Sequence, residues 1–298
     1  MKKVFLLVFS IFLTAAFFAD AATADDPAIR IMTYNIRMNT PSDGINAWPN
    51  RKDHVAEMIR DKYQVDIVGV QEALIEQVHD LEARLTDYMR IGVGRDNGWD
   101  QGEHMAIFFR KDRFELLQQN TFWLSETPEI PGVTSWESAC NRIVTWGKFK
   151  DRTSGREFYH FNTHFDHRSQ KARVESAKLI WRRIQAMTNG LPVVLTGDFN
   201  IQETNEAYAI LTGKEPADGD DRSDLKDARY ITKIPHQGPT STFTRNQWTE
   251  TGAPETKIDF IFVRNGFQVL SHQVPNDKYD GRYPSDHLPV VADLAFPE

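Results

Sequence analysis

The chain has 298 residues and a formal net charge of −7. This acidic balance weakens the case for indiscriminate binding to duplex nucleic acid, which relies on many phosphate contacts from Lys and Arg, although it leaves room for a local basic groove. Cys140 is the single cysteine, which excludes an internal disulfide and means that a large apolar core must hold the fold.

The chain begins with MKKVFLLVFSIFLTAAFFADAATADD, in which two lysines precede an apolar stretch from Val4 to about Phe18, followed by small residues. This pattern is typical of a secretory signal peptide. The apolar stretch is shorter than the roughly 20 residues of a transmembrane helix, so we expect cleavage near residue 24 and no stable membrane insertion. We predict a secreted or periplasmic protein whose residues 25–298 form one domain.

Short apolar segments alternate with amphipathic ones along the rest of the chain. Segments rich in apolar and β-branched residues are typical of strands, and in chain order they are Ile29–Ile36, Val65–Val70, Met105–Phe109, Ile143–Phe149, Phe158–Thr163, Pro192–Thr196, Ile258–Val263 and Val290–Ala295. Helices are predicted at Arg51–Asp61, at Ile75–Leu85 and over Ser169–Met187, where apolar residues recur at spacings of three and four. Because strands and helices mix throughout, we predict an α/β (α+β) protein with mixed sheets covered by helices.

Polar side chains stand at or beside the ends of these strands. Taken singly, each has a simple structural explanation, such as a turn, the first residue of a helix or a solvated position. Together they predict one pocket, because strand ends are where a rigid backbone meets a crevice. The residues are Asn35, Glu72, Asn162, His164, Asp166, His167, Asp198, Asn200, Asp259, Asp286 and His287.

The residue types at these strand ends favour a hard cation. Several of them offer only oxygen ligands, and neither a cysteine cluster nor a paired-histidine spacing occurs. Such a donor set suits Mg²⁺ or Mn²⁺ better than Zn²⁺. His287 is then a candidate general base, a neutral imidazole that Asp259 would orient and that would take a proton from water. The alternative interpretation of His287 is a satisfied surface histidine.

The segments TYNIR, GVQE, NTHFDH, GDFN, IDFIFV and SDHLPV, in this order, resemble the endonuclease/exonuclease/phosphatase superfamily. This superfamily includes DNase I-like nucleases, abasic-site endonucleases, deadenylases, sphingomyelinases and inositol polyphosphate phosphatases. The resemblance runs from about Arg30 to Leu294. It implies a four-layer DNase I-like sandwich, with two mixed β-sheets packed face to face and helices outside. It also implies an in-line attack of water on phosphorus without a covalent enzyme intermediate.

The resemblance implies roles for individual residues. Asn35, Glu72 and Asp286 match positions that bind the metal ion in the family. His287 and Asp259 match its catalytic His–Asp couple. These assignments make Mg²⁺ or Mn²⁺ the expected cofactor.

Further positions match residues that handle the phosphate. Asp198 and Asn200 match the pair that orients the attacking water and holds the phosphate, and His164 matches a histidine that binds or protonates phosphate oxygens. Glu103 in GEHMAIFFR resembles the acid that orients this group. Arg142 in CNRIVTW falls where members place a phosphate-facing arginine, although an arginine before a strand is as often a surface residue.

The substrate is the least defined part of the prediction. We expect a phosphodiester, cleaved by a nuclease or phosphodiesterase, and the alternatives are a phosphomonoesterase acting on a sugar or inositol phosphate and a non-catalytic binding module. A nuclease needs a basic groove with stacking aromatics; the basic residues within 168–183 would supply it or form a solvated helix face. Trp48, Trp123 and Trp136 line a substrate wall or pack their loops. The complete set of polar residues disfavours the binding module, and no protein partner can be inferred.

Overall fold

The computed structural model describes residues 28–254 and 256–296. The predicted signal peptide and the start of the predicted domain at residue 25 lie outside the described residues. Within this part of the chain, the strands form two six-stranded sheets and one two-stranded ribbon. None of the helices described there combines the length and the apolar composition that crossing a membrane requires.

The first sheet has the strand order β13–β14–β1–β2–β4–β3. Its strands are β1 (Ile29–Asn35), β2 (Ile67–Gln71), β3 (Tyr88–Ile91), β4 (Ile107–Arg110), β13 (Gln268–Gln273) and β14 (Val290–Ala295). β1 and β2 are parallel, and the other neighbours are antiparallel. The carboxyl ends of β1 and β2 therefore lie at the same edge as the amino end of β14.

The second sheet has the strand order β5–β6–β7–β8–β12–β9. Its strands are β5 (Phe114–Trp123), β6 (Ile143–Asp151), β7 (Glu157–His164), β8 (Val193–Asp198), β9 (Lys226–Asp227) and β12 (Asp259–Arg264). The parallel pair is β7 and β8. Asp198 is in register with His164 on one side and with Asp259 on the other, so these three residues share one end of the sheet.

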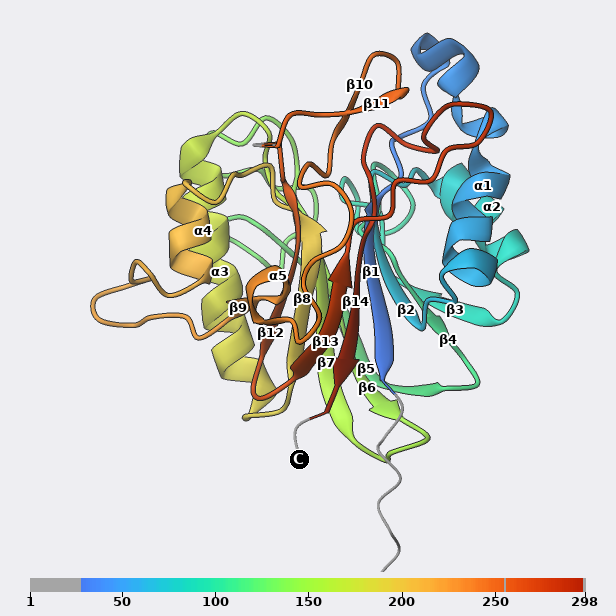
Figure 1. Cartoon of the computed structure of the whole chain (residues 1–298). Coiled ribbons are helices and arrows are strands. Elements are labelled where there is room, and N and C mark those ends of the chain that lie inside the picture. Colours follow the sequence, from blue (N-terminus) through green and yellow to red (C-terminus); the bar gives the residue numbers. More distant parts are fainter. Residues whose placement is uncertain (1–27, 255, 297–298) are drawn as a thin grey trace, which may run out of the picture.

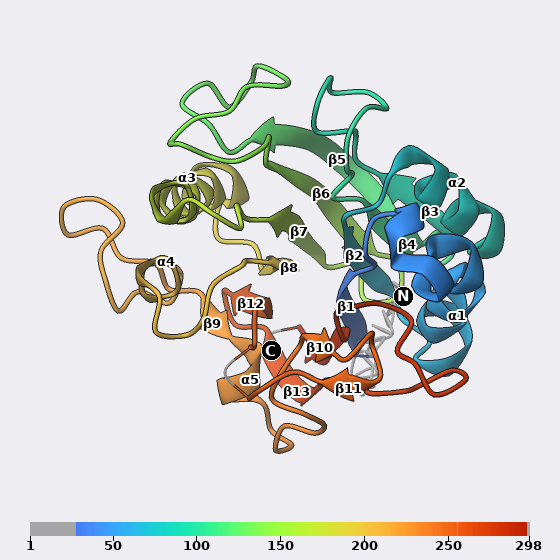
Figure 2. The same ribbon diagram turned by 90° about the horizontal axis from the view of Figure 1, so that it is seen from above.

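Helices cover the outer faces of both sheets (Figures 1 and 2). α1 (Lys52–Glu57), which continues as a π-turn over Met58–Lys62, and α2 (Ile75–Arg84) cover the first sheet. α3 (Gln170–Thr188) and α4 (Glu206–Leu211) cover the second. The remaining short elements are the 3₁₀ turns Pro41–Asn46 and Trp48–Asn50, α5 (Ala228–Ile231), and the ribbon of β10 (Thr244–Arg245) and β11 (Glu250–Thr251).

Apolar clusters fill the three spaces between these layers. Phe109 and Phe149 lie in the cluster between the sheets, Val55 lies in the cluster under α1, and Ile180 lies in the cluster under α3. All four of these side chains are fully buried. The four-layer sandwich that the sequence predicts is therefore confirmed.

A polar seam crosses the interior between the sheets near the site end. Gln71 Nε2 donates to Asn162 Oδ1 at 2.7 Å, and Thr196 Oγ1 donates to the same oxygen at 3.1 Å. Asn162 Nδ2 donates in turn to the carbonyl of Val70 at 2.9 Å. A Cβ atom on Gly69 would lie 2.5 Å from Asn162 Oδ1, so this glycine permits the close approach of the two sheets.

The predicted elements match the structure, and several elements were missed. Each predicted strand is present, and the predicted helix over Ser169–Met187 corresponds to α3, whose first amides are capped by Ser169. The helix predicted at Arg51–Asp61 changes to a π-turn after Glu57. The strands β3, β5, β9, β10, β11 and β13 and the helices α4 and α5 were not predicted.

Candidate active site

The polar strand-end residues gather at one end of the sandwich, where both sheets contribute. Asn35 ends β1, Glu72 follows β2, and Asp286 and His287 precede β14 in the first sheet. The second sheet contributes His164, Asp198 and Asp259, with Asn200 just beyond β8. The two groups touch directly, because Asn35 Nδ2 donates to Asp198 Oδ2 at 2.9 Å. The convergence expected from the sequence is therefore present.

His287 lies between two carboxylates. Its Nδ1 atom is 2.9 Å from Asp259 Oδ2, and its Nε2 atom is 3.7 Å from Asp198 Oδ2. All three side chains are buried, which excludes the surface-histidine interpretation. Since His287 belongs to the first sheet and Asp259 to the second, the expected His–Asp contact also joins the two sheets.

These carboxylates control the protonation of the imidazole. Burial lowers the pKa of His287, but the charges of Asp259 and Asp198 raise it more, so that its pKa lies well above the usual value. Burial and repulsion from Asp259 raise the pKa of Asp198 to about 7. Both shifts favour keeping a proton within the cluster of His287, Asp198 and Asp259 while no cation is bound. A cation held beside these carboxylates would offset their charge and lower the pKa of His287.

Asn35 holds the carboxylates through its amide nitrogen. Asn35 Nδ2 donates to Glu72 Oε1 at 3.0 Å and to Asp198 Oδ2, and it lies 3.4 Å from His287 Nε2. Its Oδ1 atom accepts from the backbone N–H of Arg37 at 3.0 Å. With two carboxylate oxygens accepting from one NH₂ group, the amide oxygen faces away from the carboxylates. In this arrangement the amide nitrogen of Asn35 positions Glu72 and Asp198, and the role of Asn35 as a metal ligand stays a prediction.

Glu72 and Asp286 form a partly buried acidic pair. Glu72 adopts a left-handed backbone conformation (φ 62°) directly after β2, and its Oε2 atom accepts from the backbone N–H of Met38 at 3.0 Å. Burial raises the pKa of Glu72, but the donors from Met38 and Asn35 lower it more, so the net shift is downward. Burial raises the pKa of Asp286, and the charge of Glu72 adds to that rise.

Arg37 shows that this acidic pair suits a cation. Its guanidinium lies 3.9 Å from Glu72 Oε2 and 3.8 Å from Asp286 Oδ2. Two partly buried carboxylates that repel each other favour positive charge between them, and their oxygen donors match the preference of Mg²⁺ or Mn²⁺. Glu72 and Asp286 are therefore the residues that could hold such an ion.

His164 lies on the other side of Asp198. Asn200 Nδ2 is 2.9 Å from His164 Nε2 and also donates to the carbonyl of Phe165 at 3.1 Å. His164 Nε2 is accordingly the acceptor, and the ring proton lies on Nδ1, which faces Glu103 Oε2 at 3.8 Å. Burial, together with the charge of Arg142, holds the pKa of His164 well below its usual value. A neutral imidazole is thus favoured here.

Arg142 is a buried cation with unused donors. The residue is 5 % exposed, which excludes the surface interpretation. Its Nη2 atom is 3.0 Å from His167 Nδ1, and its Nε atom is 3.7 Å from Asp166 Oδ2. Arg142 Nε and Nη1 have no hydrogen-bond partner among the described residues. Nearby, Arg95 pairs with Glu103 at 2.6 Å. Buried guanidinium donors without partners suit a bound anion.

Two clusters of potential metal-ligand atoms occur within the described residues. In each, the ligand atoms lie within 4.8 Å of one another, and the clusters are Asp198–Asp259–His287 and Cys140–Asp166–His167. The first belongs to the site just described. In the second, both oxygens of Asp166 already accept hydrogen bonds from Ser138 and from backbone amides. The second cluster is therefore the poorer metal site, because its carboxylate oxygens already have partners.

The tryptophans named in the sequence analysis pack their loops. Trp48 Nε1 donates to Asp80 at 2.9 Å, and Trp123 Nε1 donates to the carbonyl of Arg95 at 2.7 Å. Trp136 packs against the apolar cluster beneath α3. The packing interpretation is thus confirmed for all three.

The basic residues of α3 are largely neutralised by neighbouring acids. They lie on the outer helical layer of the second sheet (Figure 1). The ion pairs are Lys171–Glu137, Lys178–Glu175, Arg182–Asp218 and Arg183–Glu129. The solvated-face interpretation therefore fits the structure better than a basic groove.

Three arginines at or near the site were not identified from the sequence. Arg37 bridges the acidic pair, Arg95 pairs with Glu103, and Arg51 binds backbone carbonyls beneath the site. Arg37 lies within the segment TYNIR, which could have drawn attention to it. No pattern in the sequence marks the other two.

The fold and the site define a class of protein: a two-sheet α/β sandwich whose sheets share a buried His–Asp couple and an acidic pair. Residues 32–287 match the profile of the endonuclease/exonuclease/phosphatase family. The chain belongs to this family, whose members are hydrolases that act on phosphate esters. The resemblance stated from the sequence is confirmed.

Solved structures and curated relatives agree with this assignment. The chain is 40 % identical to an endonuclease/exonuclease/phosphatase from Bacteroides vulgatus, over 90 % of this chain and 98 % of that one, with a TM-score of 0.81. It is 36 % identical to a mannosyl-6-phosphatase from Bacteroides thetaiotaomicron, over 90 % and 100 % of the two chains, with a TM-score of 0.82. It is 26 % identical to nocturnin from Homo sapiens over 91 % of this chain, and the match spans 66 % of nocturnin.

Proposed function

We propose that this protein is a metal-dependent phosphoesterase that hydrolyses a sugar phosphate monoester by in-line attack of water. The observation that carries the reaction type is the contact of His287 with Asp259, made between the two sheets, with His287 Nε2 facing Asp198. This contact provides a proton acceptor at the site end of the sandwich. The predicted signal peptide supports action outside the cytoplasm.

The water is activated by the chain's own groups. Asp259 orients His287 through Nδ1, which leaves Nε2 to accept a proton from water, with Asp198 beside it as the second acidic group. Asn35 fixes Asp198 and Glu72 at hydrogen-bond distance. This arrangement supports a fixed direction of attack.

Glu72 and Asp286 would hold the metal ion. When bound, Mg²⁺ or Mn²⁺ supplies positive charge that stabilises the pentavalent phosphorus and the leaving oxygen. Arg37, which lies within 4 Å of both carboxylates, balances their remaining charge and keeps them close together.

Phosphate binding is assigned to the opposite side of Asp198. The Nδ1–H of His164 has no hydrogen-bond partner among the described residues and is a free donor there, while Asn200 holds the ring at Nε2 and Glu103 lies 3.8 Å from Nδ1. Arg142 is buried and has donors without partners. A terminal phosphate carries up to two negative charges, so a buried guanidinium beside a neutral histidine suits a monoester.

Two further observations favour a monoester over the diester first expected from the sequence. The chain shares 36 % identity over 90 % of its length with a mannosyl-6-phosphatase. Four of the five basic residues of α3, which a nucleic-acid groove would need, are occupied in ion pairs. A sugar phosphate requires neither a long groove nor a stacking platform.

The reaction type is tested by the variant His287→Ala. Loss of the proton acceptor should lower kcat on a phosphomonoester by about 10²–10⁴-fold in the presence of Mn²⁺. His79→Ala, at an exposed position of α2, is the matched control and should leave kcat unchanged. Turnover that survives in His287→Ala would remove this residue from the mechanism.

The substrate class is tested in a panel measured with Mg²⁺ or Mn²⁺ and again with a chelator. The panel contains mannose 6-phosphate, an inositol phosphate, a bis-aryl phosphodiester, single-stranded DNA and RNA. The proposal predicts the highest kcat/KM for the sugar phosphate and loss of activity with the chelator. Preference for any diester would restore the first expectation from the sequence.

A further inference from the structure

A cavity of about 480 Å³ adjoins the acidic pair on the side of the ribbon β10–β11. Residues 42–46 line it on one side, and Gln247 and Trp248 line it on the other. Gln247 is exposed, Trp248 is partly exposed, and Ile45 is 60 % exposed at the rim. No residue of this cavity belongs to the catalytic set assigned above.

Asp43 connects this cavity to the cation-binding carboxylates. It lines the cavity, and its Oδ2 atom lies 3.2 Å from Arg37 Nε. The same Nε atom lies 3.8 Å from Asp286 Oδ2. A single guanidinium group therefore lies between the wall of the cavity and the acidic pair.

The far wall of the cavity is held in place by several contacts. Gln247 and Trp248 both adopt left-handed backbone conformations (φ 53° and 65°), which non-glycine residues keep only where surrounding contacts enforce them. Asn46 Nδ2 donates to the carbonyl of Gln247 at 3.2 Å. The backbone N–H of Tyr283 donates to the carbonyl of Trp248 at 2.8 Å. The Arg51 guanidinium lies 5.1 Å from the centre of the Trp248 ring.

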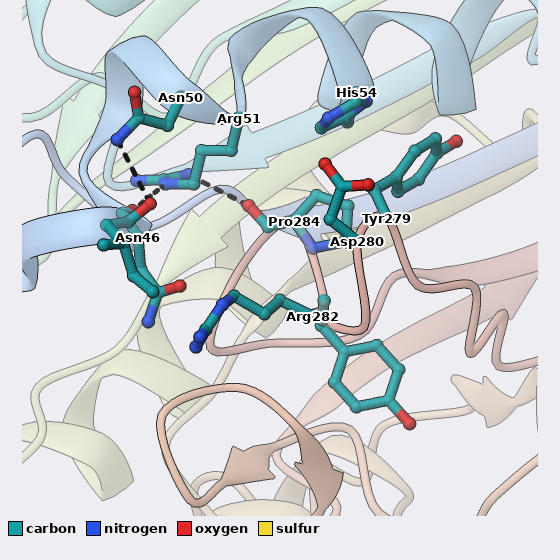
Figure 3. A pocket seen from close by; sticks show the side chains of 10 residues that line it. Asn46, Asn50, Arg51, His54, Tyr279, Asp280, Arg282 and Pro284 are labelled. Carbon is teal, nitrogen blue, oxygen red and sulfur yellow. Dashed lines mark hydrogen bonds between the residues drawn. The ribbon is translucent and has the colours of Figure 1, made fainter.

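Figure 3 shows the Arg51 guanidinium between the backbone carbonyls of Asn46 and Pro284. Arg51 Nε donates to the carbonyl of Asn46 at 2.8 Å, and Nη1 donates to that of Pro284 at 3.2 Å. Pro284 lies two residues before Asp286 in the chain. The wall of the cavity and the acidic pair are thus built on one rigid frame.

The chemistry of the lining fits a sugar ring. An indole offers an apolar surface for the C–H groups of a pyranose, while a carboxylate, amides and a hydroxyl bond its hydroxyl groups. We infer that this cavity is the subsite for the sugar moiety of the phosphate ester, and that Trp248 and Gln247 determine specificity for it. This inference rests on the proposed function, since it assigns the leaving group of that reaction.

The test compares a sugar ester with an ester that lacks a ring. Wild-type protein and the variant Trp248→Ala are assayed with Mn²⁺ on mannose 6-phosphate and on methyl phosphate, by release of inorganic phosphate. We expect kcat/KM for mannose 6-phosphate to fall about tenfold, mostly through KM, because the stacking surface is lost. The loss on methyl phosphate should be clearly smaller, because Arg51 keeps its carbonyl partners Asn46 and Pro284 when the ring is removed. Trp99→Ala, at a tryptophan that is 75 % exposed and outside the cavity, should change neither.

A second variant distinguishes loss of the subsite from loss of the fold. Gln247→Ala removes only an exposed side chain and keeps the carbonyl that Asn46 binds, so its Tm should equal that of the wild type. Its KM for mannose 6-phosphate should still rise several-fold. An unchanged KM in both variants, or an equal loss on both substrates, would overturn the subsite.

Two outcomes separate this inference from the proposed function. If the wild type hydrolyses no phosphomonoester, the proposed function itself fails. If the wild type hydrolyses phosphomonoesters, and Trp248→Ala selectively lowers kcat/KM for adenosine 5′-monophosphate and not for mannose 6-phosphate, the proposed function stands. The cavity is then a nucleobase site, and the sugar subsite is wrong.

Discussion

Asp166 shows how one side chain shapes the phosphate side of the site. Its Oδ1 atom accepts from the backbone N–H groups of Arg168 and Ser169 at 2.9 and 2.7 Å, and its Oδ2 atom accepts from Ser138 and Ala139. Burial raises the pKa of Asp166, but these donors lower it more, to about 2. The carboxylate therefore fastens the start of α3 to the loop that precedes β6.

The variant Asp166→Asn should lose a stabilisation that depends on pH. The folded pKa lies below the unfolded value of about 3.9, so the charged form stabilises the fold above pH 4, and this contribution disappears as the pH falls from about 4 to 2. We expect the free energy of unfolding to drop by about 1–3 kcal/mol at neutral pH. The difference from the wild type should shrink toward pH 2.

Urea unfolding at a series of pH values measures this effect. Asp220→Asn, at an exposed position, is the matched control and should leave the free energy of unfolding unchanged throughout. A difference between Asp166→Asn and the wild type that is constant from pH 2 to pH 7 would show that the charge of Asp166 is not the source of its stabilisation.

At the scale of the elements, Arg51 clamps three chain segments together. Its guanidinium donates to the carbonyls of Ile36, Arg37, Asn46 and Pro284. It is buried between the rings of Trp48 and Trp248, at 5.0 and 5.1 Å from their centres. The end of β1, the turn before α1 and the segment before β14 are thereby fixed to one another.

The variant Arg51→Lys should weaken both the fold and the reaction. One ammonium group cannot replace a planar fork that serves several carbonyls and stacks between two rings. We expect a loss of about 2–3 kcal/mol in the free energy of unfolding. We also expect a lower affinity for Mn²⁺, because Glu72 and Asp286 are no longer held at a fixed separation. Arg60→Lys, at an exposed arginine of the neighbouring π-turn, serves as the control.

Two measurements check this variant. Urea unfolding reports the stability, and the rise in Tm on adding Mn²⁺ reports the integrity of the acidic pair independently of turnover. An Arg51→Lys protein with the wild-type response to Mn²⁺ would show that Arg51 stabilises the fold without positioning the carboxylates.

Much of the fold could be predicted because its central elements carry clear patterns. The interior strands β1, β8 and β12 are almost entirely apolar between their polar ends, and α3 repeats Ala177, Ile180 and Ile184 along its buried face. Strands at the sheet edges lack this signal. β5 alternates irregularly through Gln118 and Gln119, and β13 is half polar, because each faces solvent along one side.

The site could be predicted as a set of residues but not as a geometry. Strand-end motifs identified the carboxylates and histidines, since rigid strands determine where such groups meet. The orientation of the Asn35 amide and the bridging position of Arg37 depend on neighbours that are distant in sequence. The raised pKa of His287 has the same origin, because it requires Asp198 and Asp259 to approach from the other sheet.

At the scale of the whole molecule, the charge distribution opposes nucleic-acid binding. The net charge is −7, and four of the five cations of α3 are held in ion pairs with neighbouring acids. Proteins that bind duplex DNA non-specifically reach dissociation constants of about 10⁻⁴–10⁻⁶ M at physiological salt through unpaired basic side chains. This protein should bind more weakly than that range.

An electrophoretic mobility shift with a random duplex at physiological salt checks this expectation. The same measurement on the variant Asp218→Asn, which releases Arg182 from its ion pair, asks whether freeing one cation strengthens binding. A micromolar complex with the wild type would reinstate a nuclease as the leading candidate.

The first sheet is interrupted in sequence by the whole of the second. Its early strands end with β4 at Arg110, and it is completed only when β13 and β14 return after Arg264. The acid and the imidazole delivered by this last return, Asp286 and His287, are thus synthesised only after every strand of the second sheet. On the proposed mechanism, a nascent chain that stops before this return lacks its proton acceptor and is inert however much of the sandwich it contains.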